Sequence, residues 1–152
     1  SGVEGSVMTH PPVSHREALR CQMDADIVLL LQWNGAAERG NVPGKLFEYL
    51  ATHRPILGHG DPEGVPAGII SRRDAGLYSN DPEEVRAFVE AKLAEKRRLG
   101  YVPATAEAAS QGFDRDSAYR VLEQFLHNVS GIAGTEAREL RVDERRDQAQ
   151  QD

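Results

Sequence analysis

The chain has 152 residues and a formal net charge of −6 at pH 7, a length that fits one ordinary domain. The acidic balance argues against a general nucleic-acid binder, because neutralising phosphates requires a basic face. A single cysteine, Cys21, argues against a disulfide framework or a cysteine-rich zinc site, and we expect a small buried residue there. The longest apolar run, residues 27–31, is too short to cross a bilayer.

The first third of the chain predicts a short strand, a helix and a second strand. Residues 7–9 have the composition of a short strand that two prolines end. Ser14 and Glu17 have the spacing of a capping box, in which each side chain accepts from the other residue's backbone amide, so we expect a helix there. Five consecutive apolar residues within 26–31 indicate a strand buried on both faces, as in a parallel sheet.

A loop over 33–42 then leads to a helix predicted for 43–51, with Pro43 in the first turn, where proline is favoured. The expected buried stripe of this helix is Leu46, Phe47 and Leu50. Residues 55–58 indicate a second buried strand. Residues 67–70 and 75–78 indicate two further short segments, of which the later one is a strand.

Two helices are predicted for the remainder of the chain. Asp81 caps the first of them, Pro82 occupies its first position and Gly100 ends it. Its expected core residues are Val85, Phe88, Val89 and Leu93. The last helix begins after 113–114 and has the clearest amphipathic pattern of the chain. That pattern consists of Ala118, Val121, Leu122, Phe125, Leu126 and Val129.

This order of elements predicts the fold class and the domain boundaries. Strands that alternate with helices imply βαβ units, so we expect an α/β fold with a Rossmann-like parallel sheet and helices on both faces. Apolar residues become scarce after residue 130. We therefore expect one domain over 1–130 and a polar, disordered tail over 131–152.

One segment combines features that suit a phosphate ligand. The loop over 33–42 leaves the carboxyl end of the most apolar strand, which is where ligands bind in open parallel sheets. It delivers the chain to a helix N-terminus at Gly44 and Lys45, where backbone amides and the helix dipole favour an anion. Glu48 follows one turn later and is suited to accept hydrogen bonds from sugar hydroxyls. The pattern therefore favours a nucleoside diphosphate.

The segments 13–19, 25–30 and 42–57 resemble the C-terminal, donor-binding domain of GT-B-fold glycosyltransferases. The similarity is greatest to the retaining group known as family 4, or glycosyl transferases group 1. In that group a helix with the pattern Pro-x-Lys, two hydrophobic residues, Glu-Tyr precedes a short strand. Pro43, Lys45 and Glu48 match this pattern, and the resemblance extends over about residues 6–129.

The resemblance implies a role for individual residues. Glu48 would hold the ribose hydroxyls of a nucleotide-sugar donor, and the amides of Gly44 and Lys45 would bind its diphosphate. It also implies a donor-sugar loop that contains Glu38, Gly40 and Asn41, and a base pocket near Thr9 and Val13. The nucleotide-diphosphate sugar would be a substrate, its hexosyl group would pass to an unknown acceptor, and neither a cofactor nor a metal is expected. No residue is assigned to catalysis.

The chain also departs from the family pattern. Many members carry a glutamate that contacts the donor sugar at the position of Gly40, and Glu38 is displaced from that position by two residues. Two-domain enzymes of this type are much longer than this chain. We therefore expect an incomplete domain that needs an N-terminal acceptor domain or a partner subunit, and we leave open whether the chain by itself is an enzyme.

Three alternatives remain at this point. The first is a non-catalytic or split nucleotide-binding module that acts through a partner chain. The second is a homodimer formed through an exposed apolar face, which is compatible with the first. The third is a generic flavodoxin-like or other nucleotide-binding domain outside this family. Trp33 either borders a ligand cleft or covers the sheet. We expect a cytoplasmic protein. The cations Lys96, Arg97 and Arg98 favour the C-terminal end of a helix; the alternative is that they bind the inner membrane peripherally together with Arg72 and Arg73.

Overall fold

The computed structural model describes residues 4–130, and the predicted tail over 131–152 lies outside them. The chain divides into two compact units, residues 1–111 and residues 112–152. The helices are α1 (His15–Asp24), α2 (Gly44–Thr52), α3 (Val65–Arg72), α4 (Pro82–Leu99) and α5 (Arg115–Ser130), and the strands are β1 (Val28–Leu31), β2 (Ile56–His59) and β3 (Gly76–Tyr78). Short 3₁₀ turns lie at Glu4–Ser6, Ala36–Glu38 and Glu107–Ala109.

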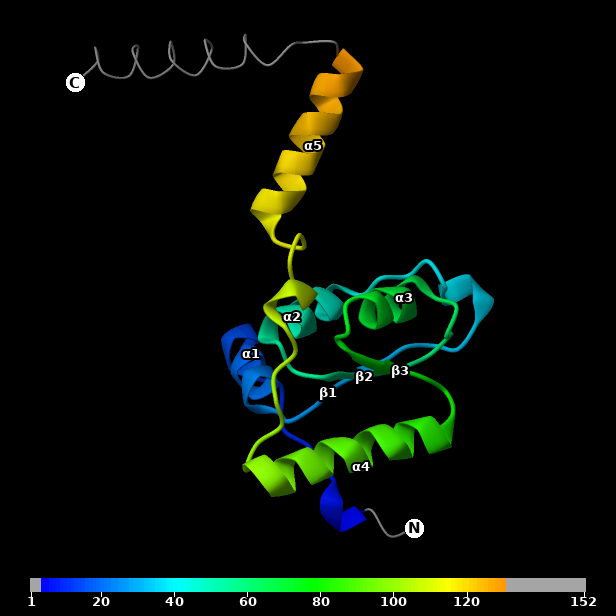
Figure 1. The fold of residues 1–152 in the computed structure, drawn as a ribbon, viewed down its shortest axis with the longest axis vertical. Coiled ribbons are helices and arrows are strands. Elements are labelled where there is room, and N and C mark those ends of the chain that lie inside the picture. Colours follow the sequence, from blue (N-terminus) through cyan, green and yellow to red (C-terminus); the bar gives the residue numbers. More distant parts are fainter. Residues whose placement is uncertain (1–3, 131–152) are drawn as a thin grey trace, which may run out of the picture. The chain divides into compact units, whose positions relative to one another are not determined.

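The first unit is built around a parallel sheet in the order β1-β2-β3. Val28 lies beside Ile56, which in turn lies beside Gly76, so the three strands run in register. Helices α2 and α3 lie on one side of the sheet and α4 lies on the other, while α1 packs against α2 (Figure 1). The predicted α/β fold, with a Rossmann-like parallel sheet and helices on both faces, is therefore confirmed.

The core lies between the sheet and helices α2 and α3. Leu46 and Leu50 of α2, Ile56 of β2 and Ile70 of α3 are fully buried. Burying one such aliphatic side chain contributes about 1.5–3 kcal/mol, so this small cluster holds the layers together. The prediction for Phe47 was wrong, because its side chain is exposed at the border of the core.

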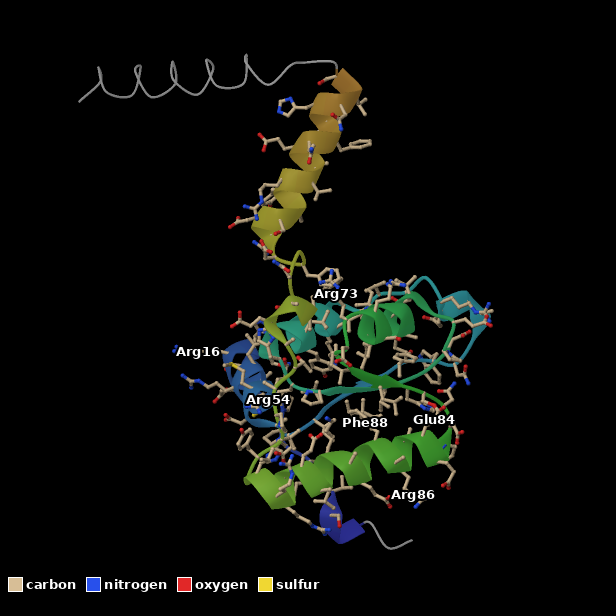
Figure 2. All side chains as sticks on the ribbon, viewed as in Figure 1. Arg16, Arg54, Arg73, Glu84, Arg86 and Phe88 are labelled. Atoms are coloured by element: carbon tan, nitrogen blue, oxygen red, sulfur yellow. The ribbon has the colours of Figure 1, made fainter. Side chains whose placement is uncertain are left out.

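Helix α4 begins and ends as its sequence predicts. The Asp81 carboxylate accepts from the amide of Glu83 at 2.9 Å, and Gly100 ends the helix with a left-handed φ of 86°. Phe88 is on the side of α4 that faces the sheet, whereas Arg86 is on the opposite side (Figure 2). The predicted burial of Val89 and Leu93 was wrong, because a three-stranded sheet is too narrow to cover the whole apolar side of this helix.

The expectation that β1 is buried on both faces was also wrong. Val28 and Leu30 are buried, but Leu29 is 51% exposed and Leu31 is 66% exposed. The reason is that β1 is an edge strand, which pairs only with β2 in the described part of the chain. The apolar run predicted the parallel sheet correctly, while the position of the strand in the sheet decided its burial.

The strand predicted for residues 7–9 is not formed. Residues 7–14 belong to no helix or strand, and Val7 and Met8 are exposed. A strand is stable only when it pairs with a neighbour, and the described sheet contains no fourth strand to pair with. The segment over 67–70, left unassigned by the sequence, is the middle of helix α3, with Pro66 near its N-terminus.

The capping box of α1 is present as predicted. The Glu17 amide donates to Ser14 Oγ at 3.3 Å, and the Ser14 amide donates to the Glu17 carboxylate at 3.0 Å. The expectation for Cys21 was wrong, because this cysteine is exposed. Helix α1 packs against α2, and Cys21 lies on a side of α1 that α2 does not cover.

Helix α5 forms where its amphipathic pattern predicts, in the second unit of the chain. No residue of this helix is buried. The exposed members of its apolar stripe include Val121, Leu122, Phe125, Leu126 and Val129. Helix periodicity therefore predicted the element, but it did not show what the stripe packs against.

Candidate functional site

The N-terminus of α2 is open. Pro43 precedes the helix and has no side chain that could cap it, and the Leu46 amide donates to the Pro43 carbonyl at 3.0 Å. The amides of Gly44 and Lys45 are the donors that a helix start leaves unpaired, and no side chain of the described residues caps them. This arrangement favours an anion, because the amides and the positive end of the helix dipole point the same way.

Gly44 has no packing reason to be glycine. A Cβ atom built at this position would meet no heavy atom within 4 Å. Both Gly44 and Lys45 are exposed, so the helix start is accessible from solvent. A glycine with free space around it allows a bulky anion to approach the backbone closely.

Glu48 lies one turn further along α2 and is partly buried against α1. Gln22 Nε2 of α1 donates to Glu48 Oε2 at 3.3 Å. The Oε1 atom of Gln22 is buried and has no partner among the described residues. Burial, and secondly the negative charge of Glu48, raise the pKa of the neighbouring Tyr49. Glu48 is thus held in position by its hydrogen bond from Gln22.

The structure brings two residues of the predicted donor-sugar loop together. Asn41 Nδ2 donates to the Glu38 carboxylate at 2.9 Å. Gly40 lies between them in sequence and is exposed, with open space around it. Arg39 of the same loop turns away to the Asp61 carboxylate, at 2.9 Å. The loop is therefore held by its own hydrogen bonds and by an ion pair to the turn after β2.

Thr9 and Val13, the residues expected near a nucleobase, lie in the exposed chain that precedes α1. No hydrogen bond of the described chain joins either of them to Glu48 or to the α2 N-terminus. The expected ribose and diphosphate residues therefore share helix α2, whereas the expected base residues belong to a different segment of the chain.

A polar network that the sequence did not predict lies at the carboxyl ends of the strands. Tyr78 Oη donates to Gln32 Oε1 at 3.0 Å, and Gln32 Nε2 donates to the Asn41 carbonyl at 3.1 Å. The Gly60 amide donates to Asn80 Oδ1 at 3.0 Å. Burial, and secondly the charge of Asp61, raise the pKa of Tyr78. The available signal was that Gln32 directly follows a predicted strand and Tyr78 ends another.

Trp33 is 84% exposed, so it does not cover the sheet. It lines a cavity of about 330 Å³ together with Leu31 and Gln32. His59, at the end of β2, is exposed, and its Nδ1 lies 3.4 Å from the Ser79 carbonyl oxygen. His59 and Ser79 thus add a further polar contact at the carboxyl ends of the parallel strands.

Two searches for other features gave negative results within residues 4–130. No three of the histidine, cysteine and acidic side chains described there gather closely enough to hold a metal ion. No helix in the same residues has the length and hydropathy that a membrane span requires.

Comparisons with protein-family models, with curated proteins and with solved structures found no match to this chain. What the protein binds must therefore be inferred from the chemistry of the open helix start, the adjacent carboxylate and the polar strand ends.

Proposed function

We propose that this chain is the nucleotide-sugar donor-binding part of a glycosyltransferase that transfers a hexosyl group. The observation that supports the proposal most is the uncapped start of α2, one turn before the partly buried Glu48. The amides of Gly44 and Lys45 and the Lys45 ammonium offer positive charge to a diphosphate. Glu48 offers carboxylate oxygens to the ribose hydroxyls of the same ligand.

Such an arrangement favours departure of the nucleoside diphosphate. Charge develops on the diphosphate as the bond to the anomeric carbon breaks, and donors already aimed at it lower the barrier without reorganising. The acceptor would be held by an N-terminal acceptor domain or a partner subunit. We expect this chain alone to bind the donor weakly and to turn it over little. A cytoplasmic location, or peripheral binding at the inner membrane through Lys96–Arg98, belongs to the same proposal.

Isothermal titration calorimetry with uridine and guanosine diphosphate sugars tests the proposal. We expect Glu48→Gln to weaken binding by about tenfold, because the variant replaces a charge-assisted hydrogen bond with a neutral one. Glu123→Gln, an exposed glutamate on α5, is the matched control and should bind as the parent chain does. Affinity unchanged in Glu48→Gln would contradict the proposal. Tighter binding of flavin mononucleotide or NAD would favour the flavodoxin-like alternative.

A second candidate function is a non-catalytic or split module that acts through a partner chain, and the open edge of β1 favours it. The amides of Val28 and Gln32 donate to β2. Backbone groups alternate along a strand, so those of Leu29 and Leu31 face away from the sheet, beside two exposed apolar side chains. Light scattering over a range of concentrations tests the homodimer form of this alternative, which a monomer at every concentration would contradict.

A further inference from the structure

Trp33 is the only tryptophan of the chain, and most of its surface is in contact with solvent. Large aromatic side chains gain much free energy from burial, so an exposed one at a ligand-binding edge calls for an explanation. Trp33 directly follows Leu31 and Gln32, at the carboxyl end of β1. In open parallel sheets, ligands bind outside this end of the strands.

The cavity beside Trp33 is small and partly polar. Its volume of about 330 Å³ is at the lower end of the range for small-molecule sites, which is roughly 300–1,000 Å³. Among the described residues that line it, Gln32 contributes a polar group, while Leu31 and Trp33 contribute apolar surface. A single sugar ring has this mixed character, with apolar C–H faces and polar hydroxyl edges.

Gln32 retains hydrogen-bonding capacity that a sugar could use. Its Oε1 accepts from Tyr78 and its Nε2 donates to the Asn41 carbonyl, so the side chain is held in one orientation. A primary amide offers two donor hydrogens and two acceptor positions, and these bonds use one of each. One N–H and one lone pair remain to bind hydroxyl groups.

From these observations we infer that Trp33 is the platform for the hexose ring of the donor, stacked on its indole face, with Gln32 binding the ring's hydroxyls. This inference rests on the proposed function and names the subsite for the transferred sugar. The loop over 34–43 joins Trp33 directly to the open start of α2. Consecutive segments of the chain would therefore hold the hexose and the diphosphate of one ligand.

The competing occupant is a second copy of the chain, because Leu29, Leu31 and Trp33 form an exposed apolar line along the free edge of β1. A strand from a second copy would cover this line with apolar side chains. It would then leave the remaining N–H and lone pair of Gln32 without partners, which is costly in a buried interface. A sugar covers the indole and satisfies the amide at once.

The fluorescence of Trp33 itself provides the test, since no other tryptophan contributes. UDP-glucose and GDP-mannose are titrated against UDP and GDP, with binding followed in parallel by calorimetry. We expect the preferred nucleotide sugar to change the Trp33 emission and its nucleoside diphosphate to change it little. Trp33→Ala should weaken binding of that nucleotide sugar by about tenfold and leave the diphosphate affinity unchanged, while Trp33→Phe restores most of the loss.

Tyr101→Ala, which removes another exposed aromatic ring, is the control and should not alter either affinity. Equal losses for the nucleotide sugar and the nucleoside diphosphate in Trp33→Ala would overturn the hexose assignment. Emission that follows protein concentration instead of ligand would assign Trp33 to a second copy. Calorimetric binding with unchanged emission would reject this inference and leave the proposed function standing, whereas no binding of any nucleotide would reject both.

Discussion

At the scale of single residues, Gly44 is a position where neither helix stability nor packing requires a glycine. The backbone of a helix favours alanine over glycine, and the space around Gly44 would accept a methyl group. The residue therefore weakens the helix slightly without helping the packing of the described chain. Under the proposed function, close approach of an anion to the α2 amides is the reason for a glycine at this position.

Gly44→Ala tests this reason. We expect the free energy of unfolding to stay unchanged or to rise by up to about 1 kcal/mol, since alanine is the better helix former. Affinity for the nucleotide sugar should fall, because the methyl group occupies the space through which the diphosphate approaches. Urea unfolding and calorimetry measure the two effects. Gly35→Ala, in the loop that precedes α2, with open space and an extended φ of −170°, is the control. Equal affinities of both variants would contradict the explanation.

Asp61 is a second residue whose surroundings decide its chemistry. It is 8% exposed and accepts from Arg39 Nε and from the Glu63 amide, each at 2.9 Å. The hydrogen bond from Arg39, followed by that from the Glu63 amide, lowers the pKa of Asp61 below the ordinary 3.8. The ion pair fixes the loop over 34–43 to the turn after β2, so it positions the predicted donor-sugar loop.

A lowered carboxyl pKa stabilises the fold above the unfolded-state pKa, and this contribution is lost as the pH falls through the folded-state value. Asp61→Asn should therefore lower the urea midpoint at neutral pH. The difference from the parent chain should shrink progressively below about pH 4. Urea unfolding at a series of pH values measures it. A difference that is the same at neutral and at strongly acidic pH would show that Asp61 acts through packing alone.

At the scale of elements, a few close contacts between α2, α3 and the strands define the first unit. Gly76 of β3 has a φ of 149°, and a Cβ atom at this position would overlap the backbone of Ile56 in β2. Only glycine permits this approach of the two strands. Leu46 of α2 is fully buried over the same sheet.

Leu46→Ala should lower the free energy of unfolding by about 2–5 kcal/mol, because it removes buried methyl groups and leaves a cavity that the core fills only in part. Urea unfolding followed by far-ultraviolet circular dichroism measures the loss. Leu93→Ala on α4, a partly exposed leucine, is the matched control and should cost clearly less. Equal losses would mean that the core does not lie between α2 and the sheet.

At the scale of the whole molecule, each of the two units exposes apolar side chains that the elements of the same unit do not cover. One exposed line follows the edge of β1, and another follows helix α5 in the second unit. Such surfaces are typical of protein or ligand contacts, since isolated soluble domains expose few large apolar patches. Under the proposed function, an acceptor domain or a partner subunit would cover such surfaces.

Substitution of Phe125 tests whether the apolar stripe of helix α5 is covered in solution. Its side chain is exposed within the second unit, so a stripe that nothing covers predicts that Phe125→Ser changes the free energy of unfolding by less than about 0.5 kcal/mol. Urea unfolding at low protein concentration measures this value. A loss of more than about 1 kcal/mol would show that the α5 stripe is buried in solution, and comparison at high concentration would reveal burial between two copies.

Much of the local structure was predictable. Ser14 and Glu17 marked the start of α1 correctly, and Asp81 and Gly100 marked the two ends of α4. Each cap could be predicted because it depends on residues within four positions of it in the sequence. The apolar run of β1 and the alternation of elements predicted the parallel sheet. Within the candidate site, Gly44 and Glu48 were identified by their spacing on one helix, which the structure retains.

The sequence by itself therefore determined helices α1, α2, α4 and α5, strands β1 to β3 and their parallel arrangement, since these follow from local hydrogen bonds, apolar periodicity and the order of elements. Only the tertiary structure decided the exposure of Leu31 and Cys21, the contact of Gln22 with Glu48, and the network from Gln32 to Tyr78. These features join residues far apart along the chain, or depend on whether a neighbouring element covers a surface. Local sequence patterns do not specify which residues from distant parts of the chain come into contact.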